Sequence, residues 1–99
     1  MSKPYMLTYD LNNPGQNYEE LRKVIENEIS SGAWCHFWDS TYLLRSNNSA
    51  SEIVDKLRSI IDDTDRLFVS EVKTGSDANY SGWLTDKQWS YIKDNILGF

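Results

Sequence analysis

The hydrophobic and polar positions of this 99-residue chain follow two different periods. Short runs in which apolar residues dominate, or alternate with polar ones, predict four β-strands at about 5–10, 33–38, 41–45 and 66–72. Apolar residues at three- and four-residue spacing predict three helices, which follow the first, third and fourth strands. The order is therefore β-α-β-β-α-β with one further helix after it.

Each predicted helix begins at a residue suited to cap it. A Ser, Thr or Asn that is followed three residues later by Glu or Gln predicts a capping box, which satisfies free backbone N–H groups of the first turn. We expect the first helix to follow a turn at 12–15 and to end at 30–32, where Gly32 can take the left-handed conformation. The capping pairs are Asn17 with Glu20, Ser49 with Glu52, and Thr85 with Gln88.

This order predicts an α+β, ferredoxin-like fold, in which a four-stranded antiparallel sheet carries two helices on one face. A chain of 99 residues is long enough for one hydrophobic core, so we expect a single domain. Residues 1–74 are assigned to the βαββαβ core, and residues 75–99 to a loop and the C-terminal helix.

The second face of such a sheet is expected to be polar if it meets water. Here both sides of the second strand are apolar, because alternation places Trp34, His36 and Trp38 on one side and Cys35 and Phe37 on the other. Either the C-terminal helix or a second subunit must cover the second face. We predict a homodimer, because a two-fold symmetric pair is the commonest assembly of small proteins. The surface residues expected to contact a partner are Trp34, His36, Trp38, Tyr42, Tyr80 and Trp83.

Composition and charge narrow the classes of function. The formal charge of −5 argues against a protein that coats nucleic acid through a basic stripe. Cys35 is the single cysteine, so an internal disulfide is impossible and a reducing, cytoplasmic location is expected. No apolar run reaches membrane-spanning length and no signal-peptide pattern is present, so we expect no membrane partner.

Three segments of the chain carry a resemblance to a known family. They are Thr-Tyr-Asp-Leu at 8–11, the aromatic segment 34–44, and Gly-Trp-Leu at 82–84. With the order of elements, they resemble the small dimeric CRISPR-associated proteins that partner the integrase during spacer acquisition, some of which are described as endoribonucleases. The chain is similar above all to their stand-alone SinR-like relatives. The resemblance implies a ferredoxin-like homodimer that serves as an adaptor or as a nuclease.

The same resemblance implies a role for Asp10, which closes the first strand. Asp10 of both subunits would lie near the dimer axis and bind a divalent metal such as Mg²⁺, which favours carboxylate oxygen and could activate water for phosphodiester hydrolysis. The alternative is that Asp10 caps the following turn by accepting a backbone N–H of Asn12 or Asn13. We favour the cap, because acidic residues along the first helix offset the charges of Arg22 and Lys23. The helix therefore lacks the basic surface that DNA-bridging members of the family display.

Other chemistry-bearing residues favour structural roles. His36 needs an orienting partner to act as a base, and Cys35 beside it faces the opposite side of the strand. We therefore expect packing or interface roles for both. The acidic residues Asp62, Asp63 and Asp65 lack the spacing and glycine of a calcium loop, so we expect a solvated turn.

Aromatic and basic residues near the C-terminal end leave two interpretations open. They can form a surface on which single-stranded nucleic acid stacks, or the tryptophans can pack the last helix onto the sheet or a partner subunit. We favour packing for both tryptophans. The residues concerned are Tyr80, Trp83, Trp89, Lys73, Lys87 and Lys93.

Three functional hypotheses follow. The first is a non-catalytic dimeric interaction module with a protein or nucleic-acid partner, for which no cofactor is expected. The second is a metal-dependent endoribonuclease that uses Mg²⁺ and Asp10 of both subunits. The third is an acidic inhibitor from a mobile element that acts on a nucleic-acid-binding protein, for which the negative charge is the argument.

Overall fold

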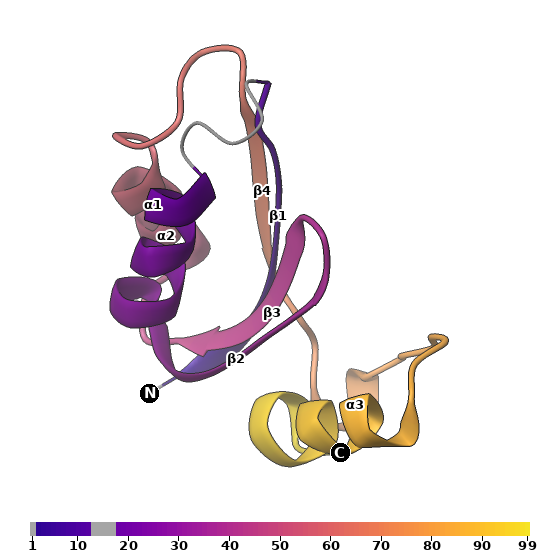
Figure 1. Cartoon of the computed structure of the whole chain (residues 1–99). Coiled ribbons are helices and arrows are strands. Elements are labelled where there is room, and N and C mark those ends of the chain that lie inside the picture. The colour runs from indigo at the N-terminus through magenta and orange to yellow at the C-terminus, as the bar shows by residue number, and fades with distance from the viewer. Residues whose placement is uncertain (1, 13–17) are drawn as a thin grey trace.

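The computed structural model describes residues 2–12 and 18–99 of the chain. It shows an α+β fold in which helices lie on both sides of one sheet (Figure 1). Here η1 and η3 are π-helical turns that continue α1 and α3, and η2 is a 3₁₀ turn. The elements are β1 (Lys3–Asp10), α1 (Tyr18–Val24), η1 (Ile25–Ile29), β2 (Ser30–Trp38), β3 (Thr41–Ser46), α2 (Ala50–Leu57), β4 (Arg66–Glu71), η2 (Gly75–Asp77), α3 (Asp86–Tyr91) and η3 (Ile92–Leu97).

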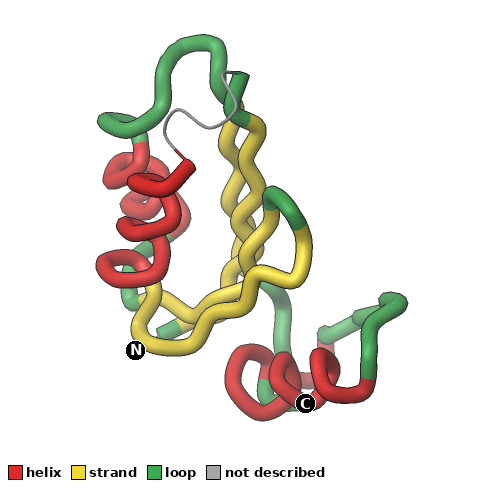
Figure 2. The backbone as a smooth tube through the Cα atoms, viewed as in Figure 1, coloured by secondary structure: helices red, strands yellow, loops and turns green. Residues whose placement is uncertain are grey.

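The four strands form one antiparallel sheet in the order β2-β3-β1-β4 (Figure 2). Leu7 at the centre of β1 lies opposite Tyr42 of β3 and Val69 of β4. This order follows from two β-α-β units whose strands interleave, which is the split arrangement of ferredoxin-like folds. The predicted fold class is confirmed.

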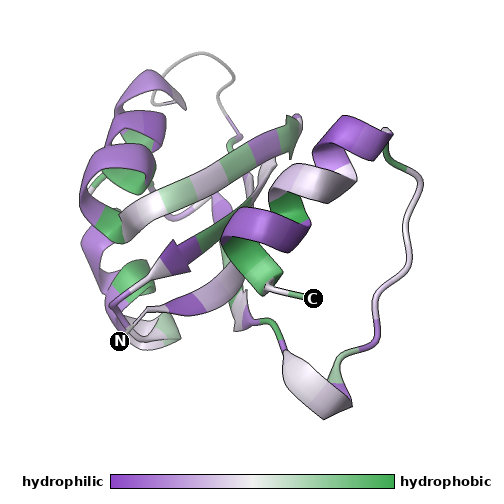
Figure 3. Ribbon diagram, turned by 90° about the horizontal axis from the view of Figure 1, so that it is seen from below, coloured by the Kyte–Doolittle hydropathy of each residue, from purple (hydrophilic) through white to green (hydrophobic). Residues whose placement is uncertain are grey.

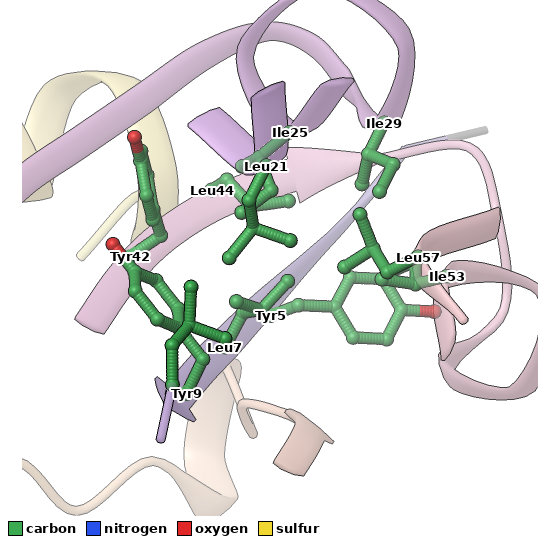
Figure 4. Packing of buried hydrophobic residues seen from close by; sticks show 11 residues of the cluster. Tyr5, Leu7, Tyr9, Leu21, Ile25, Ile29, Tyr42, Leu44, Ile53 and Leu57 are labelled. Atoms are coloured by element: carbon green, nitrogen blue, oxygen red, sulfur yellow. The ribbon is translucent and has the colours of Figure 1, made fainter. Parts of the chain in front are cut away.

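One face of the sheet builds the main hydrophobic core against α1, η1 and α2 (Figure 4). Tyr5, Leu7 and Tyr9 of β1 point into it, as strand alternation requires. Burying each large aliphatic side chain contributes about 1.5–3 kcal/mol, so this face, which has the larger cluster, contributes most of the hydrophobic stabilisation. Its most buried members are Tyr5, Leu7, Tyr9, Leu11, Leu21, Ile25, Ile29, Tyr42, Leu44, Ile53 and Leu57.

Two of the three predicted capping boxes are present. At the start of α2, the Glu52 amide donates to Ser49 Oγ at 3.1 Å and the Ser49 amide donates to Glu52 Oε1 at 2.7 Å. Thr85 and Gln88 make the same pair of hydrogen bonds at the start of α3. The third predicted cap, Asn17, and most of the turn at 12–15 lie outside the described residues.

The predicted end of the first helix is wrong. The helix ends at Ile29, and Ser30 already has extended backbone angles and begins β2. Gly32 lies within that strand at φ 134°, so its positive φ serves a bend in the strand rather than a helix cap. The Gly32 amide donates to Ser30 Oγ at 3.0 Å, which stabilises the bend locally. Sequence reasoning mistook a strand irregularity for a helix terminus.

A β-bulge changes which residues of β2 share a face. Cys35 pairs with Leu43, but Trp38 pairs with Thr41, so β2 has one residue more than β3 between these pairs. The extra residue reverses the alternation, and Trp38 therefore lies on the second face with Leu43. The prediction that Trp34, His36 and Trp38 share one side is wrong for Trp38.

The C-terminal segment covers part of the second face of the sheet. Figure 3 shows its helix lying beside the strands, on the side away from α1 and α2. The side chains of Ile92, Ile96 and Leu97 pack with Cys35 of β2 in a second, smaller core. The Arg45 guanidinium of β3 fixes this helix by donating from Nη1 to the Ile96 carbonyl oxygen at 2.5 Å. The helix thus covers most of the β2–β3 half of this face and leaves Trp38 partly exposed.

Candidate functional site

The other half of the second face is open. Here the term open face means the surface that is formed by Met6, Thr8 and Asp10 of β1, Phe68 of β4 and Trp38 of β2. The strand register places these residues on one side, because Thr8 lies opposite both Phe68 and Thr41, and Thr41 lies opposite Trp38. Met6 and Trp38 are each 38% exposed and Phe68 is 61% exposed. The open face is therefore an apolar surface with a carboxylate at its end.

A groove separates the open face from the chain that leads to α3. Its volume is about 390 Å³, and its walls include Met6, Trp38 and Leu43 from the sheet and Trp83 and Trp89 from the C-terminal segment. The first three residues also line an adjoining hollow of about 280 Å³. The groove is mostly apolar and opens to solvent beside the exposed strand residues.

Trp83 lies at the rim of this groove and is fully exposed. Its neighbours are held in place: a Cβ on Gly82 would come within 3.2 Å of the Trp89 ring, and Leu84 packs against the second core. Trp89 also contacts Phe99, with ring centroids 6.2 Å apart, as expected for a packing residue. The expectation that Trp83 packs the last helix onto the sheet is wrong within this chain.

Tyr80 belongs to the same segment and is partly buried. Its hydroxyl group donates to the Lys73 carbonyl oxygen, and its ring lies 5.3 Å from that of Phe99. These contacts close the segment between β4 and α3 onto the end of the chain. Tyr80 therefore holds the segment that presents Trp83, and its own ring is not a free stacking surface.

Asp10 is exposed at the end of the open face. It lies opposite Arg66 of β4, and a hollow of about 160 Å³ there is lined by both residues together with Thr8 and Phe68. Within the described part of the chain, its carboxylate makes no hydrogen bond or salt bridge. Asp10 is thus available to a ligand or to a second chain.

The predicted turn cap by Asp10 is wrong for Asn12. The Asn12 amide donates to Asp65 Oδ1 at 2.8 Å, and the other carboxylate oxygen of Asp65 accepts from the Asp62 amide at 3.0 Å. Asp65 is buried at 9% exposure, so it is not part of a merely solvated turn. It joins the end of β1 to the loop before β4, and nothing in its local sequence signals this long-range role. Asn13, the other predicted donor, lies outside the described residues.

His36 packs against the main core rather than serving a catalytic pair. Its ring stacks on Tyr42 at 4.3 Å between centroids, and its Nε2 atom lies 3.3 Å from the Tyr9 hydroxyl oxygen. Partial burial lowers the pKa of His36, and the positive charge of Arg22 lowers it further. The lowered pKa favours the neutral imidazole, whose neighbours are the phenol rings of Tyr9 and Tyr42.

Tyr42 was expected at an interaction surface, and the structure corrects this. Its side chain is fully buried, and its hydroxyl group donates to Glu26 Oε2 at 2.6 Å. Burial raises the pKa of Tyr42, and the hydrogen bond to Glu26 raises it further. Trp34 packs on the same ring at 5.8 Å, so it also belongs to the first face.

The Cys35 thiol is unsuited to nucleophilic chemistry. It is buried beneath η3, and burial raises its pKa to about 11. The thiolate, which is the nucleophile, is therefore scarce at neutral pH. Because Cys35 and His36 lie on opposite faces of β2, they form no catalytic pair.

The described residues contain no group of three or more His, Cys, Asp or Glu side chains that could hold a metal ion. A Mg²⁺ ion uses one or two carboxylates and keeps several waters, so a site at Asp10 would need the Asp10 of a second copy. None of the helices in ranges 2–12 and 18–99 has the length and apolar character needed to span a membrane.

Comparisons with known proteins gave no match: no family model, no curated protein and no solved structure is significantly similar to this chain. The candidate site therefore depends on the geometry described above. Met6 and Phe68 are exposed residues of the open face that sequence reasoning did not name as site residues. Each occupies an alternate position between core residues of its strand, and this spacing was the available signal.

Proposed function

We propose that this protein is a small homodimeric interaction module without catalytic activity, and that the open face is its dimer interface. The observation that carries the proposal is the line of exposed apolar side chains on the half of the second face that the C-terminal helix leaves uncovered. This role agrees with the resemblance to the spacer-acquisition adaptor family and with the expected cytoplasmic location.

The exposed apolar area is of the size that a dimer needs. A fully exposed aromatic side chain presents about 150–250 Å². At their exposed fractions, Met6, Trp38, Phe68 and Trp83 together present roughly 500 Å². A standard interface buries about 800 Å² per partner, of which about 65% is apolar in homodimers. These four residues supply most of that apolar area, and three of them, Met6, Trp38 and Trp83, line one groove, which scattered exposed residues of a monomer would not do.

The absence of catalysis is supported by the state of the reactive groups. The Cys35 thiol has a raised pKa and the His36 imidazole is packed between tyrosines. Each chain contributes only one carboxylate, that of Asp10, to the candidate metal site. In the described part of the chain, the Cys35 thiol and the His36 imidazole therefore do not act as a paired nucleophile and base, because they lie on opposite faces of β2.

The size of the particle tests this proposal. Sedimentation equilibrium at micromolar concentration is expected to give twice the chain mass of 11.5 kDa. Phe68→Glu places a charge on the open face and is expected to give the monomer mass with an unchanged far-UV circular dichroism spectrum. Lys56→Glu, a charge change on the exposed side of α2, should remain dimeric. A wild-type protein that stays monomeric at 100 µM would refute the proposal.

A second candidate function is favoured by one observation. The Asn12 amide donates to Asp65, and no group among the described residues hydrogen-bonds the exposed Asp10 carboxylate, which lies on the proposed dimer interface. Asp10 of both subunits can then bind Mg²⁺ and support endoribonuclease activity. The wild-type protein and Asp55→Asn, which changes a remote exposed carboxylate, would cleave RNA with Mg²⁺, whereas Asp10→Asn would not. Equal or absent cleavage by all three proteins excludes this function.

Specific contact with nucleic acid has its own test. The affinity of a phosphate-binding protein falls steeply as salt rises, because each contact releases counterions. Binding of labelled single-stranded RNA between 50 and 200 mM salt therefore distinguishes a nucleic-acid partner from a protein partner. No binding at the lowest salt concentration leaves a protein as the partner of the dimer.

A further inference from the structure

Trp83 has an unusual position for so large an apolar side chain. It is 100% exposed, although Gly82 before it lies against Trp89 and Leu84 after it packs into the second core. Because both neighbours are packed, the backbone that carries the exposed indole is preorganised. Preorganisation reduces the entropic cost of binding.

The groove beside Trp83 has room for an indole. Its volume is about 390 Å³, and its sheet wall is formed by Met6, Trp38 and Leu43. An apolar protein cavity of about 150 Å³ is enough to hold benzene. Trp83 of the same chain lies at the rim and leaves this space unfilled, since none of its surface is buried.

Two-fold symmetry connects these two features. In an isologous dimer every contact between residue i and residue j occurs twice. If Trp83 of one copy enters the groove of the other, the reverse contact follows from symmetry. Both exposed indoles and both apolar grooves are then removed from water together.

We propose that Trp83 of each protomer inserts into the groove of the second copy and contacts Met6, Trp38 and Leu43 there. The inference rests on the proposed homodimer and identifies its central contact. A central tryptophan that fills an apolar pocket is the kind of residue that dominates binding energy at interfaces. Trp83→Ala is therefore expected to weaken dimerisation at least tenfold, and Trp83→Phe by less.

Sedimentation equilibrium measures the dimer dissociation constant of each variant. The matched control is Lys56→Ala, which truncates a long exposed side chain on α2 that does not line the groove. The expected order of dissociation constants is wild type and Lys56→Ala, then Trp83→Phe, then Trp83→Ala. A Trp83→Ala protein that dimerises as tightly as the wild type overturns the inference and leaves the homodimer standing.

A photo-cross-link identifies the occupant of the groove. Benzoylphenylalanine replaces Trp83, and protein labelled with ¹⁵N is mixed with unlabelled protein before irradiation. The expected product joins position 83 of one isotope form to a peptide that contains Met6 or Leu43 of the other form. Cross-links confined to one isotope form, or only to other regions of a second copy, overturn the inference.

The remaining outcomes concern other occupants. If the wild-type protein is monomeric, the proposed function fails and this inference fails with it. If the dimer forms but position 83 cross-links only to added single-stranded RNA, Trp83 is a base-stacking residue and the inference alone is wrong. The mass of the particle and the identity of the cross-linked peptide therefore distinguish the two failures.

Discussion

The two faces of the sheet differ in what covers them. On the first face, α1, η1 and α2 bury a continuous cluster in which Leu7, Tyr42 and Leu44 have no exposed surface. On the second face, one helical segment covers the β2–β3 half, and Met6 and Phe68 remain exposed on β1 and β4. The same strands thus have one face that stabilises the fold and another that is available for recognition.

The largest expected effect compares neighbouring residues of β1. Leu7→Ala leaves a cavity in the first face and is expected to cost about 2–5 kcal/mol of unfolding free energy. Met6→Ala changes the open face and is expected to cost less than about 1 kcal/mol. Urea denaturation in a monomeric Phe68→Glu background measures both. Equal costs would contradict the difference between the faces.

The next effect concerns the loop that closes the first face. Asp65→Asn removes the negative charge of the carboxylate that accepts hydrogen bonds from the Asn12 and Asp62 amides. We therefore expect the free energy of unfolding to fall by about 1–3 kcal/mol. Asp63→Asn is the control, because Asp63 is an exposed neighbour. The two urea midpoints should differ clearly. A stable Asp65→Asn protein would show that this carboxylate is dispensable.

These two predictions show what the sequence could and could not supply. The order of strands and helices along the chain depends on local spacing and was predicted correctly. So were two capping boxes, from Ser49 and Thr85. The positions of Trp38 and Asp65 depend on pairing with distant segments, since a bulge and a loop-to-loop hydrogen bond are set by tertiary contacts. The fold was therefore largely predictable, and the open face was not.

The Asp10 carboxylate and the exposure of Trp83 were also beyond local patterns. The sequence identified both as candidate residues, but it favoured a turn cap for the first and packing for the second. The structure assigns the Asn12 amide to Asp65 and leaves Trp83 exposed. The exposed indole of Trp83 thus adds an apolar group to the second face, and Asp10 is not capped by Asn12, the one of its two predicted donors that the structure describes.

A smaller effect tests the covered half of the second face. Arg45→Ala removes the donor to the Ile96 carbonyl oxygen and is expected to let η3 open locally. Alkylation of Cys35 at pH 8 reports this opening, because the buried thiol has a pKa of about 11 and is otherwise slow to react. Arg45→Ala should react several-fold faster than the wild type or Arg58→Ala. Equal rates would mean that Arg45 does not hold the helix.

The smallest effect is the response of the first face to pH. The folded pKa of His36 is lowered, so the unfolded chain takes up a proton first as the pH falls below about 6.5. The contribution of His36 to stability is thus complete above pH 6.5 and is lost as the pH falls toward the folded pKa. His36→Gln should show a smaller loss of stability between pH 7 and 5.5 in urea titrations. A parallel loss in both proteins would assign the pH dependence to other groups.

The claim that the open face is a dimer interface is tested most directly at Met6. In protein labelled with ¹³C at the methionine methyl groups, the Met6 signal is followed from 1 to 500 µM. We predict that it shifts or broadens with the same midpoint as the change from 11.5 kDa to twice that mass. A Met6 signal that stays unchanged while the mass doubles would place the interface elsewhere, and a mass that never doubles would remove the dimer.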